Sequence, residues 1–324
     1  MSTTADLTDP IFTNEDAAWA HFEGLRWPDG PVCPHCGSVG NATRLKGKST
    51  RRGVHKCRDC MEPFTATVGT VYERSHIPMH KWLLATHLMC ASKKGISAAQ
   101  LHRMLGFGSY RTAWFMAHRI REAMRPAGPL PPMGGEGKIV EADETYNGKV
   151  KEPRTMRTDG TPYSKNHSGR SAPRGVANKR AVVALVERGG QARTFHVATA
   201  DRATVEKIIR DNVHPASRLH TDESRLYAGL AGEFKHETVR HTAKEYVRGD
   251  VHNNSAEGYF GVFKKGMRGV YQHCAEKHLH RYLDEFSFRH NTRTKLGVTD
   301  KERAALAIKG VAGKRLTYHQ ADNA

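Results

Sequence analysis

Residues 138–145 read KIVEADET and residues 180–200 read RAVVALVERGGQARTFHVATA, and these two stretches decide the fold. Short apolar runs that are rich in β-branched residues and bounded by glycine or charge are typical of strands. DRATVEKIIRDNV at 201–213 has the apolar spacing of a helix, and SRLHTDES at 217–224 and KHETVRHTAKEYV at 235–247 are further candidate strands. Strands that alternate with a helix in this order predict an α/β domain with a mixed sheet.

Helical patterns flank this domain on both sides. Upstream, MHKWLLATHLMCAS, GISAAQLHRMLG and SYRTAWFMAHRIREAM predict three short helices, with Ser97 as a candidate N-cap and Gly106 as a candidate stop. Three helices joined by tight, glycine-containing turns suit a helix-turn-helix-like unit that binds DNA, although an ordinary packing unit with a solvated basic face is the alternative. Downstream, residues 254–291 are expected to be helical with a break around GVYQHCAEKH.

Proline and glycine mark the expected domain boundaries, and PAGPLPPMGG is the clearest linker. A basic excursion with almost no large apolar residue, at 147–180, is expected to be a mobile loop inserted into the α/β domain. The expected divisions are an N-terminal helix and ribbon at 1–75, the helical unit at 76–126, a linker at 127–137, the α/β domain at 138–310 and a tail at 311–324.

Two close cysteine pairs, CPHC at 33–36 and CRDC at 57–60, lie near the N-terminus. Zn²⁺ prefers four thiolate or imidazole ligands in a tetrahedron, and two such pairs about twenty residues apart supply them from separate turns. Four unrelated thiols would require a coincidence of both pairs. Cys33, Cys36, Cys57 and Cys60 are therefore predicted to hold a structural zinc in a zinc ribbon. A strand is expected directly after the second pair, over FTATVGTVYE at 64–73.

The charge of the chain is strongly positive. Lys and Arg number 51 against 33 acidic residues, which gives a net charge of +18. A field of this sign attracts polyanions, so nucleic acid is the expected partner, and a merely basic protein is the alternative. There is no run of eighteen apolar residues, and MSTTADLTDPIF lacks the basic start and apolar block of a secretory signal. We therefore expect a cytoplasmic protein without a membrane partner.

Three carboxylates occur where a metal site could form. Asp143 and Asp222 follow apolar strand segments, and Glu257 opens the amphipathic segment SAEGYFGVFKKG. Carboxylates from two strand ends and a helix suit Mg²⁺ or Mn²⁺, and two such ions about 4 Å apart can drive phosphoryl transfer. Any one of these acids alone could be an ordinary surface acid. The prediction depends on their combination in this order.

Neighbouring residues leave parts of this site open. Lys264 lies seven residues after Glu257, two helical turns along, and is the first candidate to hold a phosphate. The alternative cations are Lys265 and Arg268, and a solvated lysine face is the ordinary alternative to a phosphate contact. Glu141 shares the strand face of Asp143 and competes with it, whereas Asn254 shares the helix face of Glu257. Candidate DNA contacts on the third upstream helix are Arg111, Arg119 and Arg121.

Several motifs together resemble one known family. CPHCG and KCRDC, FTATVGTVYERSHIPMHKW, VEADETYNG, HTDES, VHNNSAEGYFGVFKKGMRGVYQH and LHRYLDEFSFRHN are similar to those of bacterial insertion-sequence DDE transposases of the ISXO-two-like group. The resemblance runs from about residue 12 to 310, and its last motif is the most specific. It implies an RNase H-like catalytic domain with Asp143, Asp222 and Glu257 as catalytic acids and Lys264 beside them. Some members carry Asn as the third residue, so Asn254 stays an alternative.

The resemblance also implies Mg²⁺, recognition of terminal inverted repeats in double-stranded DNA and action as a homo-oligomer on paired DNA ends. The expected reaction is hydrolysis at the ends of the element, followed by attack of the released 3′-hydroxyls on target DNA. Two rival functions remain open at this point. One is a structure-specific nuclease without strand transfer, and the other is a zinc-ribbon DNA-binding protein without catalysis.

Overall fold

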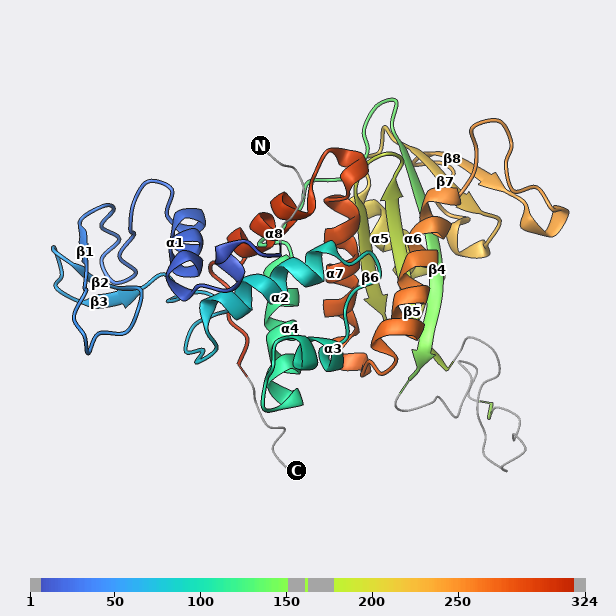
Figure 1. Cartoon of the computed structure of the whole chain (residues 1–324). Coiled ribbons are helices and arrows are strands. Elements are labelled where there is room, and N and C mark those ends of the chain that lie inside the picture. The colour runs from blue at the N-terminus through green and yellow to red at the C-terminus, as the bar shows by residue number, and fades with distance from the viewer. Residues whose placement is uncertain (1–6, 151–160, 163–177, 318–324) are drawn as a thin grey trace. The chain divides into compact units, whose positions relative to one another are not determined.

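The computed structural model describes residues 7–150, 161–162 and 178–317. Most of the basic excursion expected at 147–180 therefore lies outside the described residues. The chain divides into two compact units, and each is described by itself (Figure 1). One consists of Met1–Pro129 with Thr292–Ala324, and the other of Leu130–Asn291. The division after Pro129 falls inside the predicted linker.

The first unit begins with a small ribbon. The helix α1 (Glu15–Arg26) starts at Asn14, whose side chain accepts hydrogen bonds from the backbone N–H groups of Asp16 and Ala17. Three short antiparallel strands follow in the order β1-β2-β3: β1 (Ala42–Arg44), β2 (Val54–Cys57) and β3 (Pro63–Thr65).

The strand expected over 64–73 is wrong beyond Thr65. From there the chain turns, with the backbone N–H of Val68 bonded to the carbonyl of Thr65 and that of Thr70 to the carbonyl of Thr67. Gly69 adopts a φ of 69°, a left-handed conformation that glycine reaches without strain and that a continuing strand excludes. The alternation of small and β-branched residues here reflects burial in successive turns rather than a pleat.

The three upstream helices form as predicted. They are α2 (Met79–Ala91), α3 (Ala98–Met104) and α4 (Tyr110–Met124). The Ser97 hydroxyl caps α3 by accepting from the backbone N–H of Gln100 at 3.1 Å, and Gly106 ends that segment with a φ of 61°.

A further helix of this unit, α8 (Asp300–Lys309), comes from the far end of the chain. The Arg303 guanidinium donates to the carbonyls of Cys90 and Thr292, and the backbone N–H of Val71 bonds to the carbonyl of Val311. The compact sheet-bearing unit thus ends at Asn291, whereas the sequence patterns suggested residue 310. The helical pattern of 300–309 carries no sign of which unit it packs on, because tertiary contacts alone decide that.

The second unit is built on a five-stranded mixed sheet in the order β6-β5-β4-β7-β8. Its strands are β4 (Ile139–Lys149), β5 (Lys179–Glu187), β6 (Ala192–Val197), β7 (Arg218–Asp222) and β8 (Lys235–Val239). The first three strands along the chain pair antiparallel, whereas β7 runs parallel to β4 and β8 parallel to β7.

Helices cover both faces of this sheet (Figure 1). The helix α5 (Arg202–Asn212), capped by Asp201, packs on the face that carries Val183 and Leu185. The opposite face, with Val182 and Ala184, is covered by α6 (Asn254–Gly266) and α7 (Leu279–Asn291). The break expected between these two helices is a π-helical turn at Met267–Tyr271 followed by a 3-10 turn at Glu276–His278. The predicted fold class, a mixed sheet flanked by helices, is confirmed.

Among the described residues, none of the helices is long and apolar enough to cross a bilayer.

Candidate functional site

The ribbon brings its four predicted cysteines together. The Sγ atoms of Cys33 and Cys60 are 3.6 Å apart, those of Cys36 and Cys57 are 3.7 Å apart, and all four lie within 4.8 Å of one another. A tetrahedral zinc with Zn–S bonds of about 2.3 Å requires sulfur separations of about 3.8 Å. The four thiols therefore fit structural zinc.

Turn geometry prepares these thiols for a metal. The backbone N–H of Gly37 bonds to the carbonyl of Cys33 at 3.0 Å, and Gly37 has a φ of 79° that suits glycine. Burial raises the pKa of the Cys33 thiol, but the N–H groups of Cys36 and His35 and the neighbouring thiols outweigh this effect and lower the pKa to about 6. The neighbouring thiols, together with burial, raise the pKa of Cys36 and raise that of Cys60 to about 12. The thiolate is therefore favoured at Cys33 and opposed at Cys36 and Cys60 until a cation compensates the charge.

The sheet of the second unit sets two of the predicted acids on one face. In the parallel pairing of β4 with β7, Ile139 lies opposite Arg218 and Glu141 opposite His220. Two residues farther along each strand come Asp143 and Asp222. Neighbouring strands lie about 4.8 Å apart, and residues two apart share a face. The register therefore directs both aspartates to the face that α6 covers, and α6 carries Glu257 in its first turn.

The pKa of Asp143 depends on the neighbouring carboxyl groups. Burial, followed by repulsion from Glu144, Asp222 and Glu257, raises the pKa of Asp143 to about 8. The Glu257 side chain is half-exposed, and its Oε1 lies 3.9 Å from Nε2 of His241. Among the described residues, however, only the four cysteines have metal-ligand atoms that all lie within 4.8 Å of one another. The acids are neighbours, but their oxygens do not meet at one point.

A tyrosine–glutamate pair beside these acids has no signal in the sequence. The Tyr227 hydroxyl donates a 2.6 Å hydrogen bond to Oε2 of Glu144, the residue next to Asp143. Burial raises the pKa of Glu144, and repulsion from Asp222 adds to this effect, whereas the bond from Tyr227 lowers the pKa. Tyr227 is 83 residues from Glu144 along the chain, so only the fold reveals the pair.

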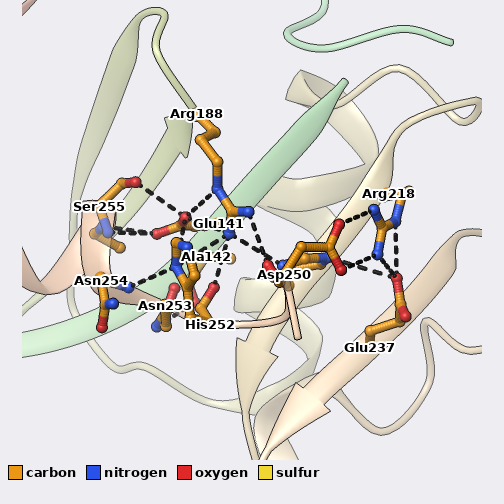
Figure 2. Close-up of polar contacts among 12 residues, drawn as sticks. Glu141, Ala142, Arg188, Arg218, Glu237, Asp250, His252, Asn253, Asn254 and Ser255 are labelled. Carbon is orange, nitrogen blue, oxygen red and sulfur yellow. Dashed lines mark hydrogen bonds and ion pairs between the residues drawn. The ribbon is translucent and has the colours of Figure 1, made fainter. Parts of the chain in front are cut away.

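Glu141, the expected competitor of Asp143, has its carboxylate fully engaged (Figure 2). It is completely buried, and it accepts hydrogen bonds from Arg188, from the hydroxyl and backbone N–H of Ser255 and from the backbone N–H of Ala256. A carboxylate with these partners is satisfied inside the protein. Asp143 is therefore the acid of β4 that stays near the other carboxyls.

Asn254 and Glu257 on α6 are the two candidates for the third catalytic residue. Asn254 is the exposed first residue of the helix, whereas Glu257 raises the pKa of Asp143 by electrostatic repulsion. The sequence did not predict a role for Asn253, which lies between the sheet and α6. Asn253 is buried, and its Nδ2 donates to the carbonyl of Ala142 at 3.2 Å. This bond joins the strand of Asp143 to the helix of Glu257.

Comparison with known proteins identifies the family. Residues 134–291 match the family described as the ISXO2-like transposase domain, and residues 13–62 match the transposase zinc-ribbon domain. Over 293 residues the chain is 30% identical to an uncharacterized protein in transposable element ISH50 of Halobacterium salinarum, and the match covers 88% of this chain and 94% of that protein. The chain belongs to the ISXO2-like transposase family. This membership confirms the resemblance drawn from the motifs.

As a transposase with a zinc ribbon, the protein belongs to families that bind DNA. The lysine and arginine residues predicted to contact DNA differ in how exposed their side chains are. On α6 and the turn that follows, Lys264 is partly exposed, and Lys265 and Arg268 are exposed. These three cations lie on the surface of the transposase domain.

The three arginines on α4 of the transposase also differ. Arg111 is exposed, whereas Arg119 donates to the carbonyls of Glu73 and Leu316 within its own unit. Arg121 is only 2% exposed, so its guanidinium is covered by protein in this conformation, and its contact with DNA stays a prediction. Part of the surface of α4 is a packing face, which α8 of the same unit contacts.

Proposed function

We propose that this transposase cleaves the ends of an insertion sequence and joins the released 3′-hydroxyls to target DNA, using Asp143, Asp222 and Glu257 to hold Mg²⁺ or Mn²⁺. One observation carries the proposal. The parallel register of β4 and β7 directs Asp143 and Asp222 to a common face, and Asp143 senses the charges of both Asp222 and Glu257.

The donor set fits hard divalent cations. Carboxylate oxygens are the ligands that Mg²⁺ prefers, and crowded carboxylates repel until a cation compensates them. Burial raises the pKa of Asp143, and that repulsion raises it further. Because the oxygens do not converge on one point among the described residues, the proposal includes a small inward movement of the half-exposed Glu257 side chain when metal and DNA bind.

The bound ions would supply a Lewis acid that lowers the pKa of the nucleophile and offsets charge on the phosphate. In the first step, water attacks the phosphodiester at the element end, the P–O bond to the 3′ oxygen breaks, and a free 3′-hydroxyl is released. In the second step, this hydroxyl attacks a target phosphodiester, one P–O bond forms, and another breaks. Asp143, Asp222 and Glu257 would hold the ions beside the reacting phosphate, and Lys264 would contact its neighbour in the backbone.

Residues other than the three acids would bind the DNA. We assign DNA-backbone contacts to Lys265 on α6 and to Arg268 in the turn after it, and further DNA contacts to the zinc ribbon and to Arg111. We also propose the basic segment 147–180 as a DNA clamp, and most of it lies outside the described residues. Terminal inverted repeats as the substrate and a homo-oligomer on paired ends complete the proposal, as the family resemblance implies.

A strand-transfer assay tests the proposal. The purified protein is incubated with Mg²⁺, a labelled element end and a target duplex, and both cleavage and joining are scored. Asp143→Ala and Asp222→Ala should abolish both steps while end binding, measured by gel shift, survives. The matched control is Asp211→Ala, which changes an exposed acid on α5 that pairs with Lys207 and should leave activity unchanged.

Each rival gives its own result in this assay. Cleavage without joining would indicate a nuclease, and end binding without cleavage would indicate a DNA-binding protein. Full activity of both aspartate variants would refute the metal-site assignment.

A further inference from the structure

The contact between β4 and the start of α6 is unusually well supplied with hydrogen bonds. Oε2 of the fully buried Glu141 accepts from the backbone N–H groups of Ser255 at 2.6 Å and Ala256 at 3.1 Å, while Oε1 accepts from the Ser255 hydroxyl at 2.9 Å. The first N–H groups of a helix have no partner within the helix. A carboxylate from a different element thus caps α6 and is favoured by the positive end of the helix dipole.

Arg188, at the turn after β5, completes the contact (Figure 2). Its Nε and Nη2 both donate to Oε1 of Glu141, at 2.9 and 2.8 Å. The same guanidinium donates to the carbonyls of Asp250 at 2.8 Å and His252 at 3.2 Å. One side chain therefore ties the segment that leads into α6 to the carboxylate on β4.

A second arginine holds the beginning of this segment. Arg218 on β7 donates to Oε2 of Glu237 on β8, with its Nη2 at 2.7 Å, and also pairs with Asp250. The Asn253 amide adds its bond to the carbonyl of Ala142. Residues 250–256 are thus attached to β4, β5 and β7, so that the start of α6 has little freedom to shift along the sheet.

The contact of Glu141 and Arg188 with the start of α6 lies close to the predicted metal ligands. Glu141 lies two residues before Asp143 on β4, and Ser255 lies two residues before Glu257 on α6. We propose that Glu141 and Arg188 are positioning residues that set Glu257 against Asp143 and Asp222, so that the three acids can share divalent metal. This inference rests on the proposed function, because it assumes that those acids hold the metal. Groups that orient metal ligands commonly affect metal affinity by about 10-fold to 100-fold.

A purely structural ion pair is the alternative, and single substitutions alone do not separate the two. Removing one partner of a buried pair leaves an uncompensated charge and destabilises strongly, whereas replacing both partners with neutral residues is often tolerated. The double variant Glu141→Gln/Arg188→Met therefore separates stability from positioning.

The matched control is Glu206 on α5, on the opposite face of the sheet. It is also buried and accepts hydrogen bonds from two arginines, Arg202 and Arg210, and from the backbone N–H of Gly229. Glu206→Gln should lower stability in the same way as Glu141→Gln without affecting the acids.

The experiment measures Mn²⁺ binding to the zinc-loaded full-length protein by the EPR signal of free Mn²⁺, with thermal melting on the same samples. Glu141→Gln should weaken Mn²⁺ binding about 10-fold, and Glu206→Gln should leave it unchanged. The double variant should regain most of the melting temperature yet keep the weakened Mn²⁺ binding. A double variant that recovers both, or a Glu141→Gln protein with wild-type Mn²⁺ affinity, overturns the inference.

Asp143→Asn separates this failure from failure of the proposed function. If Asp143→Asn loses Mn²⁺ and Glu141→Gln does not, only the positioning role is refuted. If Asp143→Asn binds Mn²⁺ as the wild type does, the metal site itself is refuted.

Discussion

The hydroxyl of Tyr227 donates a 2.6 Å hydrogen bond to Glu144, one residue from Asp143. Tyr227 is 1% exposed, and burial raises its pKa well above the ordinary value, so the phenol stays protonated and can keep donating. The bond holds a carboxylate whose own pKa is raised by burial and by Asp222. A donor of this kind stabilises a crowded acidic region without adding a positive charge.

Replacing Tyr227 with Phe should therefore destabilise the protein. A hydrogen bond to a charged or partly charged carboxylate contributes about 2 kcal/mol, and its loss leaves Glu144 without this donor. Urea unfolding of the two proteins measures the difference. Tyr246→Phe is the matched control, because Tyr246 is 58% exposed, and that change should be nearly neutral. Equal stabilities for Tyr227→Phe and the wild type would contradict the prediction.

The raised pKa of Asp143 makes stability depend on pH in a defined direction. Burial and the surrounding acids raise this pKa from 3.8 to about 8. Between these values the folded protein keeps a proton that the unfolded chain has lost. The contribution of this group to stability is therefore fully present below pH 3.8 and is lost as the pH rises through about 8.

Asp143→Asn removes this penalty. In metal-free buffer, the melting temperature of the variant should exceed that of the wild type by an amount that grows from about pH 5 to about pH 8. Adding Mg²⁺ should then raise the melting temperature of the wild type more than that of the variant. Asp211→Asn serves as the control and should show neither effect. A pH-independent difference between Asp143→Asn and the wild type would contradict a raised pKa of Asp143 as the cause.

Loss of one zinc ligand should affect the ribbon alone. Cys57→Ser removes a thiolate from a site whose metal supplies much of the folding free energy of so small a module. We expect the variant to lose zinc, measured by metal analysis, and to bind element ends more weakly while the circular dichroism of the sheet-bearing unit is retained. Cys274→Ser changes a cysteine outside the cluster and should behave as the wild type does. Undiminished zinc content in Cys57→Ser would exclude the four-cysteine site.

The third acid can be assigned by a direct comparison on one helix. Glu257→Gln should abolish cleavage, because it removes a charge that acts on Asp143. Asn254→Ala should stay within a few-fold of the wild type, because Asn254 is exposed at the first position of α6. Single-turnover cleavage in Mg²⁺ measures both. Loss of activity in Asn254→Ala with activity kept in Glu257→Gln would reverse the assignment.

Side-chain spacing along the chain predicted the parts of the fold that depend on local patterns. The apolar runs of β4 and β5 and the helix cap at Ser97 follow from side-chain spacing and capping chemistry, and the cysteine pairs follow from metal geometry. The order of elements also conveyed the α/β class. These features need no knowledge of distant contacts.

The role of Glu141 and the burial of Arg121 depend on contacts between distant parts of the chain, and local sequence patterns did not predict them. Glu141 bonds to partners 47 and 114 residues away and caps α6. From the sequence it was a competitor of Asp143 for the metal site, because the two residues share a strand face. Arg121 lies on α4, which is contacted by α8 from a much later part of the chain. The positions of both side chains follow from tertiary packing, which periodicity does not encode.

The return of residues after Thr292 to the N-terminal unit bears on how the protein is made. Val71 and Gly69 receive main-chain partners from Val311 and Gly313, and Cys90 receives Arg303. On the ribosome, every strand of the sheet is therefore synthesised before α8 can complete the helical unit. A nascent chain that stalls near residue 291 would carry all three acids but an unfinished helical unit, so translation itself delays completion of that unit until the acid-bearing one has been made.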